Sequence, residues 1–371
     1  MKITDVEVVP IRVPYATPVK IATGVLTSAD NVLVKLITDK GPVGLGETQP
    51  LPVFQGCSET QESVVQVIQN TYRPVLLGRD PADIERIMED LDAAVRGCAY
   101  AVTAVGDGLY DLVARSLNIP LYRLLGGLYW SRIEMVWSVG MKSTEEMERE
   151  ARWALDQGYQ KLKIKVGSPD PKEDVEHAFA VRKILGKDLS FRVDANAGYR
   201  FKDALNVIRA MRDVNLEFVE QPLPVWDYDG LAKLSNMIDI PIMADESCNT
   251  MQSAMELAKR GAVSIFDIKL AKNGGIYHAR KIAAIAQASN IPLYAGNQPS
   301  TSVGAAAAAH FYAATPNVIA GDFNLGPAGW LSGDIVKRPL PVDGPFAVVP
   351  DGVGIGVEID DSKLAKFSVT L

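Results

Sequence analysis

Hydrophobic and polar residues alternate in the first part of the chain, and this pattern is typical of half-buried β-strands. The alternating segments are Thr4–Val13, Asn31–Thr38 and Val43–Thr48. From Glu59 the hydrophobic period becomes helical and predicts helices that include Ile84–Val95 and Ala101–Leu117. Residues 1–125 are therefore expected to form an α+β unit, a three-stranded meander followed by helices.

Beyond Gly126 and Gly127 the pattern changes to short apolar runs that alternate with longer amphipathic stretches. Such alternation predicts parallel strand–helix units. The predicted strands are Glu134–Val139, Lys161–Val166, Leu189–Asp194, Leu216–Glu220, Ile240–Asp245, Ser264–Lys269, Pro292–Ala295 and Val318–Asp322. Eight units predict a (β/α)8 barrel over residues 126–340. A doubly wound open sheet is the alternative, but no GxGxxG motif follows a first strand.

Composition and charge narrow the class of protein. The 371 residues are 47% hydrophobic and 22% charged, which is typical of a folded globular chain. The net charge of -7 and the lack of a dense basic run argue against nucleic-acid binding. An alternating N-terminus and the absence of a long apolar run argue against secretion and membrane insertion. We therefore expect a cytoplasmic protein.

Cysteine and histidine are scarce, which limits the metal chemistry that the chain can support. The three cysteines are widely spaced, so neither a disulfide framework nor a cysteine metal site is expected. The three histidines, His177, His278 and His310, stand far apart and form no zinc-binding pattern. A divalent metal would instead be held by carboxylates, and oxygen ligands favour magnesium or a similar hard ion.

Ionisable residues occupy the ends of consecutive predicted strands. Asp194, Glu220 and Asp245 end the third, fourth and fifth strands, about 25 residues apart, which is close to the length of one strand–helix unit. In a barrel these ends open on the same face, where barrel enzymes carry out their chemistry. Crowded carboxylates repel one another unless a cation lies between them, so the spacing predicts a magnesium site. Helix capping or surface pairing is the alternative for any single residue.

Three lysines belong to the same predicted rim. Lys163 and Lys165 are two residues apart on the second strand, so both side chains point to one face, into the barrel. Each ammonium disfavours the charged form of the other, and a bound metal ion adds to this repulsion. We therefore expect one of the two lysines to act as a neutral base near pH 7. Lys269 ends the sixth strand, opposite the second in an eight-stranded barrel. Pairing with Asp267 or Glu246 is an equally good alternative for Lys269.

Five ordered motifs carry a family resemblance. They are Lys163-Ile164-Lys165-Val166-Gly167, Asp194-Ala195-Asn196, Glu220-Gln221-Pro222, Ala244-Asp245-Glu246-Ser247 and the segment Ile268–Gly275. Together they resemble the muconate-lactonizing branch of the mandelate racemase/muconate lactonizing enzyme family, within the enolase superfamily. The resemblance covers nearly the whole chain and implies an α+β cap that residues 341–371 complete by packing back on it.

The resemblance also implies a chemistry. Asp194, Glu220 and Asp245 would bind Mg²⁺, with Mn²⁺ as the alternative ion, and Asn196 and Glu246 would lie behind them. Lys165 would be the base, Lys163 its modulator and a donor to the substrate carboxylate, and Lys269 the acid, base or cation on the other face. The implied reaction removes the proton α to a carboxylate through an enediolate, which the metal stabilises.

Several reactions share that chemistry. The resemblance places a muconate cycloisomerase-like isomerase first, amino-acid or dipeptide epimerisation second and acid-sugar or hydroxy-acid dehydration third. The implied partner is a small carboxylate substrate, and a homo-oligomer, a dimer or octamer, is expected. A non-catalytic carboxylate-binding protein is the alternative from another class. The intact set of lysines and carboxylates argues against it.

Substrate choice is expected to depend on the cap loops and on the ends of the last two strands. The candidate substrate-binding residues are Phe54, Asn297, Ser300, Asp322, Asn324 and Trp330. Ser300 stands where relatives usually carry Glu, which argues against muconate itself. Asp322 and Asn324 partly match the aspartate pair with which dipeptide epimerases bind an α-ammonium. Capping of a turn before Gly326 is the alternative for these two residues.

Overall fold

The computed structural model describes residues 1–323, 326 and 329–371. Its largest sheet has eight strands in the order β12-β11-β10-β9-β8-β7-β6-β5. These strands are β5 (Trp137–Val139), β6 (Lys161–Lys165), β7 (Ser190–Asp194), β8 (Val219–Glu220), β9 (Ile242–Ala244), β10 (Ile265–Ile268), β11 (Leu293–Ala295) and β12 (Val318–Gly321). Neighbouring strands are parallel, and a hydrogen bond from Val136 N to Gly321 O (2.8 Å) joins the two edges. The predicted barrel is confirmed.

Helices follow most barrel strands, as the sequence pattern predicts. The helices of this part are α6 (Thr144–Asp156), α7 (Pro171–Leu185), α8 (Phe201–Ala210), the short 3-10 helix η2 (Arg212–Val214), α9 (Tyr228–Ser235), α10 (Met251–Arg260), α11 (Leu270–Asn273), α12 (Gly275–Ala288) and α13 (Ser302–Ala313). Capping boxes at Ser143 and Thr250 fix the starts of α6 and α10, because side-chain and backbone donors are satisfied reciprocally there.

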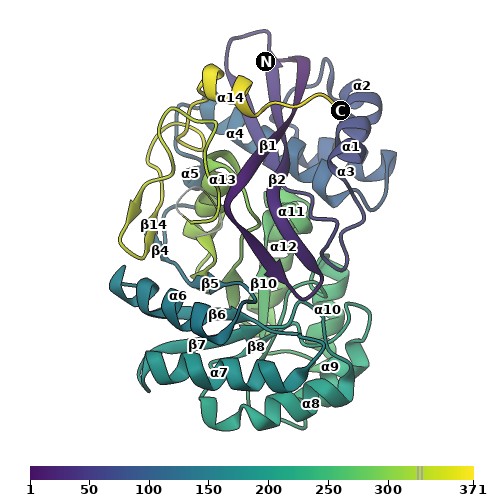
Figure 1. Cartoon of the computed structure of the whole chain (residues 1–371). Coiled ribbons are helices and arrows are strands. Elements are labelled where there is room, and N and C mark those ends of the chain that lie inside the picture. The colour runs from purple at the N-terminus through teal and green to yellow at the C-terminus, as the bar shows by residue number, and fades with distance from the viewer. Residues whose placement is uncertain (324–325, 327–328) are drawn as a thin grey trace.

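The N-terminal cap is a three-stranded antiparallel sheet covered by helices. Its elements are β1 (Ile3–Ile21), β2 (Gly24–Thr38), β3 (Val43–Thr48), α1 (Gln61–Val67), the π-helical turn η1 (Ile68–Tyr72), α2 (Arg73–Leu76), α3 (Ile84–Ala94), α4 (Ala99–Ser116) and α5 (Leu121–Leu124). In Figure 1 the hairpin of β1 and β2 runs from the cap, where both chain ends lie, down to the barrel. The cap therefore reaches the face on which the strand-end residues lie.

Several strand predictions were wrong in their extent. The segment predicted to end at Val13 continues to Ile21, and its partner begins at Gly24, because a register shift between Pro14 and Val19 lets the pairing resume beyond the prolines. The predicted strand Glu134–Val139 is divided, and only β5 belongs to the barrel sheet.

The residues before β5 belong to another sheet together with part of the C-terminal segment. This sheet consists of β4 (Arg132–Glu134), β13 (Val342–Asp343) and β14 (Phe346–Val348). The last helix, α14 (Asp361–Phe367), lies instead against β1, and Val369 N donates to Pro10 O at 3.0 Å. The segment thus contacts both parts of the molecule, and the boundaries at residues 125 and 340 stay a prediction.

One large buried hydrophobic cluster extends through both parts of the molecule, from Leu36 and Leu109 in the cap to Ile164 and Leu293 in the barrel. A second cluster joins the β1–β2 hairpin to Leu51 and Trp330. Because burial of apolar area supplies most of the folding free energy, cap and barrel are expected to stabilise each other.

Candidate active site

The strand-end residues predicted from the sequence lie together on one rim of the barrel. Lys165, Asp194 and Glu220 are the last residues of adjacent strands, and the register pairs Lys165 with Asp194 and Asp194 with Glu220. Asp245 and Lys269 directly follow β9 and β10. All of these side chains are buried. The parallel register thus converts a regular sequence spacing into one compact cluster.

Each lysine of the cluster is paired with a carboxylate. Lys163 Nζ donates to Glu220 Oε2 at 2.9 Å and to Asp322 Oδ2 at 2.5 Å. Lys165 donates to Asp194. Lys269 donates to Asp245, and its ammonium lies 3.2 Å from Asp267 Oδ2. The cluster is therefore a network of alternating charges rather than a group of like charges.

These carboxylates decide the protonation of two lysines. Burial disfavours the ammonium of Lys163, but the nearby charges of Asp322 and Glu220 outweigh that effect and raise its pKa well above the usual value. Lys269 likewise has a raised pKa, because Asp245 and Asp267 outweigh burial. Opposite charges rather than repulsion thus dominate around Lys163, and the expectation that one of the paired lysines acts as a neutral base stays a prediction.

An acidic group suited to a cation lies at the centre of the cluster. Carboxylate oxygens of Glu220, Asp245 and Asp267 come within 4.8 Å of one another. Glu220 Oε1 and Asp267 Oδ1 are buried and have no hydrogen-bond partner among the described residues. Buried oxygens without a donor are costly, and an all-oxygen donor set suits a hard divalent ion. The residues present therefore fit a magnesium-type ion.

The pKa values of these carboxyl groups differ strongly. Burial, followed by the charge of Asp194, raises the pKa of Glu220 well above its usual value. Burial also raises the pKa of Asp267 to about 7. At Asp194, Lys165 and Lys163 outweigh burial and lower the pKa, and at Asp245 Lys269 and Lys272 do the same. Ion pairing thus keeps Asp194 and Asp245 anionic.

Asp267 was not among the predicted ligands, whereas Asp194 was. Asp267 precedes Lys269 by two residues, so both side chains point into the barrel, and this spacing is the signal that could have identified it. Asp194 Oδ2 instead contacts the ammonium groups of Lys165 and, at 3.8 Å, Lys163. Asp267 thus belongs with Glu220 and Asp245 to the group of close carboxylates, and Asp194 is bound to the neighbouring lysines.

Asn196 and Glu246 are both buried, and hydrogen bonds of the Asn196 amide join Glu246 to Asp194, whereas their role behind the metal ligands stays a prediction. Asn196 Nδ2 donates to Asp194 Oδ2 at 3.3 Å and to Glu246 Oε1 at 3.1 Å. Asn196 has a φ of 41°, a conformation in which Asn is more often found than other residues with a side chain. Burial raises the pKa of Glu246 to about 8. The pair thus links the ends of two strand–loop segments.

A small pocket opens above the lysines. Its lining contains four of the predicted substrate-binding residues, Phe54, Asn297, Asp322 and Trp330. Ser300 is outside the lining, although its hydroxyl accepts a hydrogen bond from Asn297 Nδ2 at 3.3 Å. Asn324 lies outside the described residues. The sequence missed Leu26, whose place in the lining follows from the unexpected extension of the β1–β2 hairpin.

The Asp322 side chain forms hydrogen bonds with residues inside the barrel rather than with the turn that follows it. Its Oδ1 accepts hydrogen bonds from Tyr294 Oη at 2.8 Å and Ser138 Oγ at 3.2 Å, and its Oδ2 accepts from Lys163. The side chain is buried. The turn-capping alternative therefore does not describe Asp322, which instead holds the Lys163 ammonium in place.

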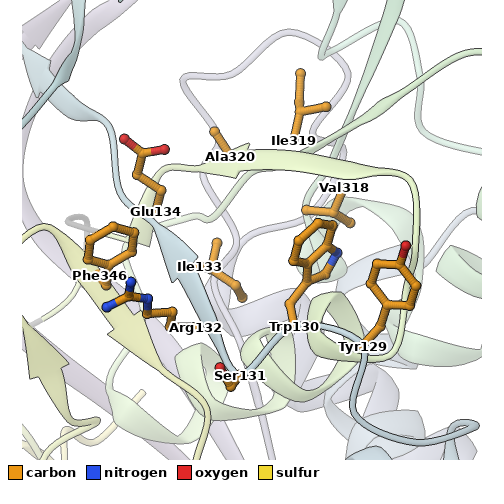
Figure 2. Close-up of a pocket in the computed structure, with 10 residues that line it drawn as sticks. All are labelled: Tyr129, Trp130, Ser131, Arg132, Ile133, Glu134, Val318, Ile319, Ala320 and Phe346. Atoms are coloured by element: carbon orange, nitrogen blue, oxygen red, sulfur yellow. The ribbon is translucent and has the colours of Figure 1, made fainter.

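A larger cavity of about 350 Å³ lies at the other end of the barrel strands. Figure 2 shows Trp130, Tyr129 and Phe346 around it, with Val318, Ile319 and Ala320 of β12 along one side. The lining comes from β12, from β4 and the three residues before it, and from Phe346 of β14, and it contains none of the strand-end residues. Size alone therefore does not identify the candidate active site, since the buried lysines of the rim line the smaller pocket.

Among the described residues, no helix combines the length and the apolar composition that a bilayer crossing requires.

Comparisons with known proteins identify the same architecture. Residues 3–126 match the model of the mandelate racemase/muconate lactonizing enzyme N-terminal domain, and residues 146–363 match that of the enolase C-terminal domain-like family. The chain is 37% identical to the L-Ala-D/L-Glu epimerase of Bacillus subtilis (strain 168) over 359 residues, which cover 96% of this chain and 97% of that protein.

Solved structures agree with this assignment. The 2-chloromuconate cycloisomerase from Rhodococcus opacus 1CP superposes with a TM-score of 0.95 at 32% identity, covering 100% of both chains. A dipeptide epimerase from Enterococcus faecalis V583, solved with Mg and the dipeptide L-Leu-L-Tyr, gives a TM-score of 0.91 at 33% identity, covering 96% of this chain and 99% of that one. The chain thus belongs to the mandelate racemase/muconate lactonizing enzyme family and is an isomerase of the enolase superfamily.

Proposed function

We propose that the protein is a magnesium-dependent racemase or epimerase that acts on the carbon α to a carboxylate. The observation that carries the proposal is the placement of two lysines on opposed strands around one acidic group. Lys165 ends β6, and Lys269 follows β10, four strands away in the eight-stranded sheet. Two bases on opposite faces allow a proton to leave from one face and return on the other.

The metal would be held by Asp194, Glu220 and Asp245, with Asp267 beside them. Support comes from the buried oxygens without donors and from relatives solved with Mg. When bound, Mg²⁺ or, alternatively, Mn²⁺ supplies positive charge that stabilises an enediolate. Asn196 and Glu246 orient the first of the ligands through the hydrogen bonds of the Asn196 amide.

The chain's own lysines divide the remaining tasks. Lys163, fixed as an ammonium by Asp322 and Glu220, is suited to donate to the substrate carboxylate. Lys165 removes the α-proton at its Nζ from one face, and Lys269 delivers a proton from the other. The cap hairpin and Trp330 lie over the pocket and exclude water from the reacting centre.

Cycloisomerisation is the second candidate, and the structural likeness to 2-chloromuconate cycloisomerase favours it. Cycloisomerisation needs a single base, so the lysine on the opposite face would have no proton to transfer. Dehydration of a hydroxy acid, the third reaction implied by the resemblance, likewise needs one base. The opposed lysines therefore favour epimerisation. A homo-oligomer and a cytoplasmic location stay predictions from the sequence.

The test follows the α-proton in deuterated water with Mg²⁺ and a panel of amino-acid derivatives of both configurations. We expect exchange with inversion. Lys165→Ala should reduce exchange from one enantiomer at least about 100-fold, and Lys269→Ala should do so from the other. Lys161→Ala, on the same strand but paired with Glu134 away from the pocket, is the matched control. If both variants lost α-proton exchange from the same enantiomer, the result would contradict a two-base mechanism.

A further inference from the structure

The cavity at the other end of the barrel strands has an apolar end and a charged end. Figure 2 shows Trp130 and Val318 at the apolar end, and Arg132 and Glu134 at the charged end. Its volume of about 350 Å³ lies within the range of about 300–1,000 Å³ that is usual for small-molecule sites. The described lining contains none of the rim lysines or carboxylates. The cavity therefore suits a small molecule that is apolar on one side and charged on the other.

The apolar end is held in a fixed shape. The backbone N–H groups of Tyr129 and Trp130 both donate to Ala313 O, at 2.7 and 3.0 Å. The indole N–H of Trp130 donates to Thr315 O at 3.1 Å, and the rings of Tyr129 and Trp130 meet edge to face with centroids 4.8 Å apart. Both side chains stay open to solvent, since Tyr129 is 60% and Trp130 38% exposed. A preformed aromatic surface of this kind suits a flat aromatic ring, because little side-chain entropy is lost on binding.

The charged end carries a guanidinium that is available to a ligand. Arg132 and Glu134 are two residues apart on β4, so their side chains leave the same face of the strand. The guanidinium carbon of Arg132 lies 4.1 Å from the centroid of the Phe346 ring, which orients it. Its ion pair with Asp343 is long, at 3.7 Å, and both side chains are more than half exposed. Exposed pairs contribute little, so a ligand carboxylate can replace Asp343.

The carboxylate of Glu134 also has room for a ligand donor. Its Oε2 lies 3.0 Å from Lys161 Nζ, the one ion-pair partner of Glu134 in the described part of the chain. A carboxylate has about four acceptor sites, so a ligand ammonium can bind beside Lys161. The charged end then contains two cations, Arg132 and Lys161, and two carboxylates, Glu134 and Asp343. A zwitterion matches this set, whereas a ligand with a single charge would leave one of the two ligand-facing groups without a partner.

We propose that this cavity is a binding site for a free aromatic α-amino acid. The aromatic ring lies against Trp130, the α-carboxylate binds Arg132, and the α-ammonium binds Glu134. An α-amino acid carries both charges on one carbon, which suits two side chains that leave the same face of one strand. The site is separate from the reaction proposed for the rim, so the two proposals can fail independently.

Four ligands that differ in one group at a time test the proposal. The full-length protein with Mg²⁺ is titrated calorimetrically with L-tryptophan, with indole-3-propionate, which lacks the ammonium, with tryptamine, which lacks the carboxylate, and with L-alanine, which lacks the ring. We expect L-tryptophan to bind at least about tenfold more tightly than each of the others. An analogue that binds the wild-type protein equally well or better overturns the proposal.

The aromatic contact is tested at Trp130. Trp130→Ala should weaken the binding of L-tryptophan at least about tenfold. Trp226→Ala is the control, because Trp226 is 75% exposed and is not part of the lining, and it should leave the affinity unchanged. The number of subunits is measured by sedimentation in parallel. If Trp130→Ala changes that number, the cavity is an interface between copies of the chain, and the proposal is overturned.

The two charged contacts have separate readouts. Glu134→Gln should abolish the preference for L-tryptophan over indole-3-propionate, and Arg132→Gln should abolish the preference over tryptamine. Glu7→Gln is the matched control, because Glu7 also pairs with one lysine, Lys35, but lies in the cap, and it should keep both preferences. A preference that persists when its charged partner is removed contradicts the proposed contact.

Lys165→Ala separates the cavity from the rim. L-tryptophan should bind this variant as tightly as the wild-type protein, because Lys165 lines the pocket on the rim and not this cavity. Binding that is lost in Lys165→Ala and kept in Trp130→Ala would place the amino acid on the rim and overturn the proposal.

Discussion

Gly296 lies against the side chains that hold Lys269. A Cβ at this position would lie 2.0 Å from Asp267 Oδ1 and 2.7 Å from Lys269 Cγ. Gly296→Ala must therefore displace the ion pair, and a displacement of about 1 Å in such a site costs on the order of 100-fold in rate. We expect α-proton exchange to fall by that factor while circular dichroism stays unchanged.

The control for this variant is Gly106→Ala in the cap, whose new Cβ would meet the flexible end of Met88 at 3.0 Å. It tests whether an added methyl group in a tight place is enough to reduce exchange. Full activity in Gly296→Ala would show that the position of Lys269 tolerates movement, and the role of Lys269 in proton transfer would then be in doubt.

At the residue scale, the sequence predicts which side chains meet but not how they pair. Asp194, Glu220 and Asp245 could be identified because strand ends converge whatever their neighbours are. The bond between Lys163 and Asp322 joins residues 159 positions apart and depends on the register of β6 and β12 around the barrel. Spacing therefore led to an expectation of repulsion between two lysines, whereas the folded chain surrounds Lys163 with carboxylates.

At the element scale, the β1–β2 hairpin connects the cap to the site. Lys20 O accepts from Met141 N at 2.8 Å, and Ile21 lines the pocket. A Cβ built on Gly198 would lie 3.1 Å from Ala22 Cβ and 2.9 Å from Ala195 O. Gly198→Ala should therefore push the hairpin tip away, at a cost of about 1–3 kcal/mol.

We expect the amides of residues 20–23 to exchange hydrogen faster in Gly198→Ala and substrate affinity to fall about tenfold or more. Gly24→Ala is the matched control in the same hairpin, because its Cβ would meet the side chain of Val53 at 3.3 Å, which can adjust. Unchanged hydrogen exchange of these amides would mean that the hairpin tip does not pack against Gly198.

The extent of this hairpin also shows what a sequence pattern omits at the element scale. Alternation stops near Pro14 and Pro18, so the strand was predicted to end at Val13, yet pairing resumes at Val19. Similarly, the predicted strand Glu134–Val139 looks continuous in its apolar pattern, but β4 pairs with the distant β14. Local periodicity cannot distinguish these pairings, because their partners lie in other parts of the chain.

At the scale of the whole molecule, buried polar contacts join the cap to the barrel. Glu47 on β3 accepts from Thr301 N at 2.9 Å and Gly304 N at 2.8 Å, at the start of α13. Thr103 Oγ1 on α4 donates to Leu270 O at 3.0 Å. These contacts satisfy helix-terminal groups of the barrel with side chains of the cap. We therefore expect the two parts to unfold in one transition.

Asp107 on α4 gives this coupling a pH dependence. Its Oδ1 accepts from Ile276 N at 2.8 Å at the start of α12, and burial raises its pKa to about 7 from 3.8. Because the folded-state pKa is raised, the unfolded state loses its proton first, and stability falls as pH rises from about 4 to 7.

Asp107→Asn keeps an acceptor without the charge, so it should stabilise the protein by about 4 kcal/mol above pH 7 and little near pH 4. Urea unfolding at both pH values measures the difference, with the exposed Asp351→Asn as control. A difference that does not change with pH would show that ionisation of Asp107 does not oppose the docking of cap on barrel.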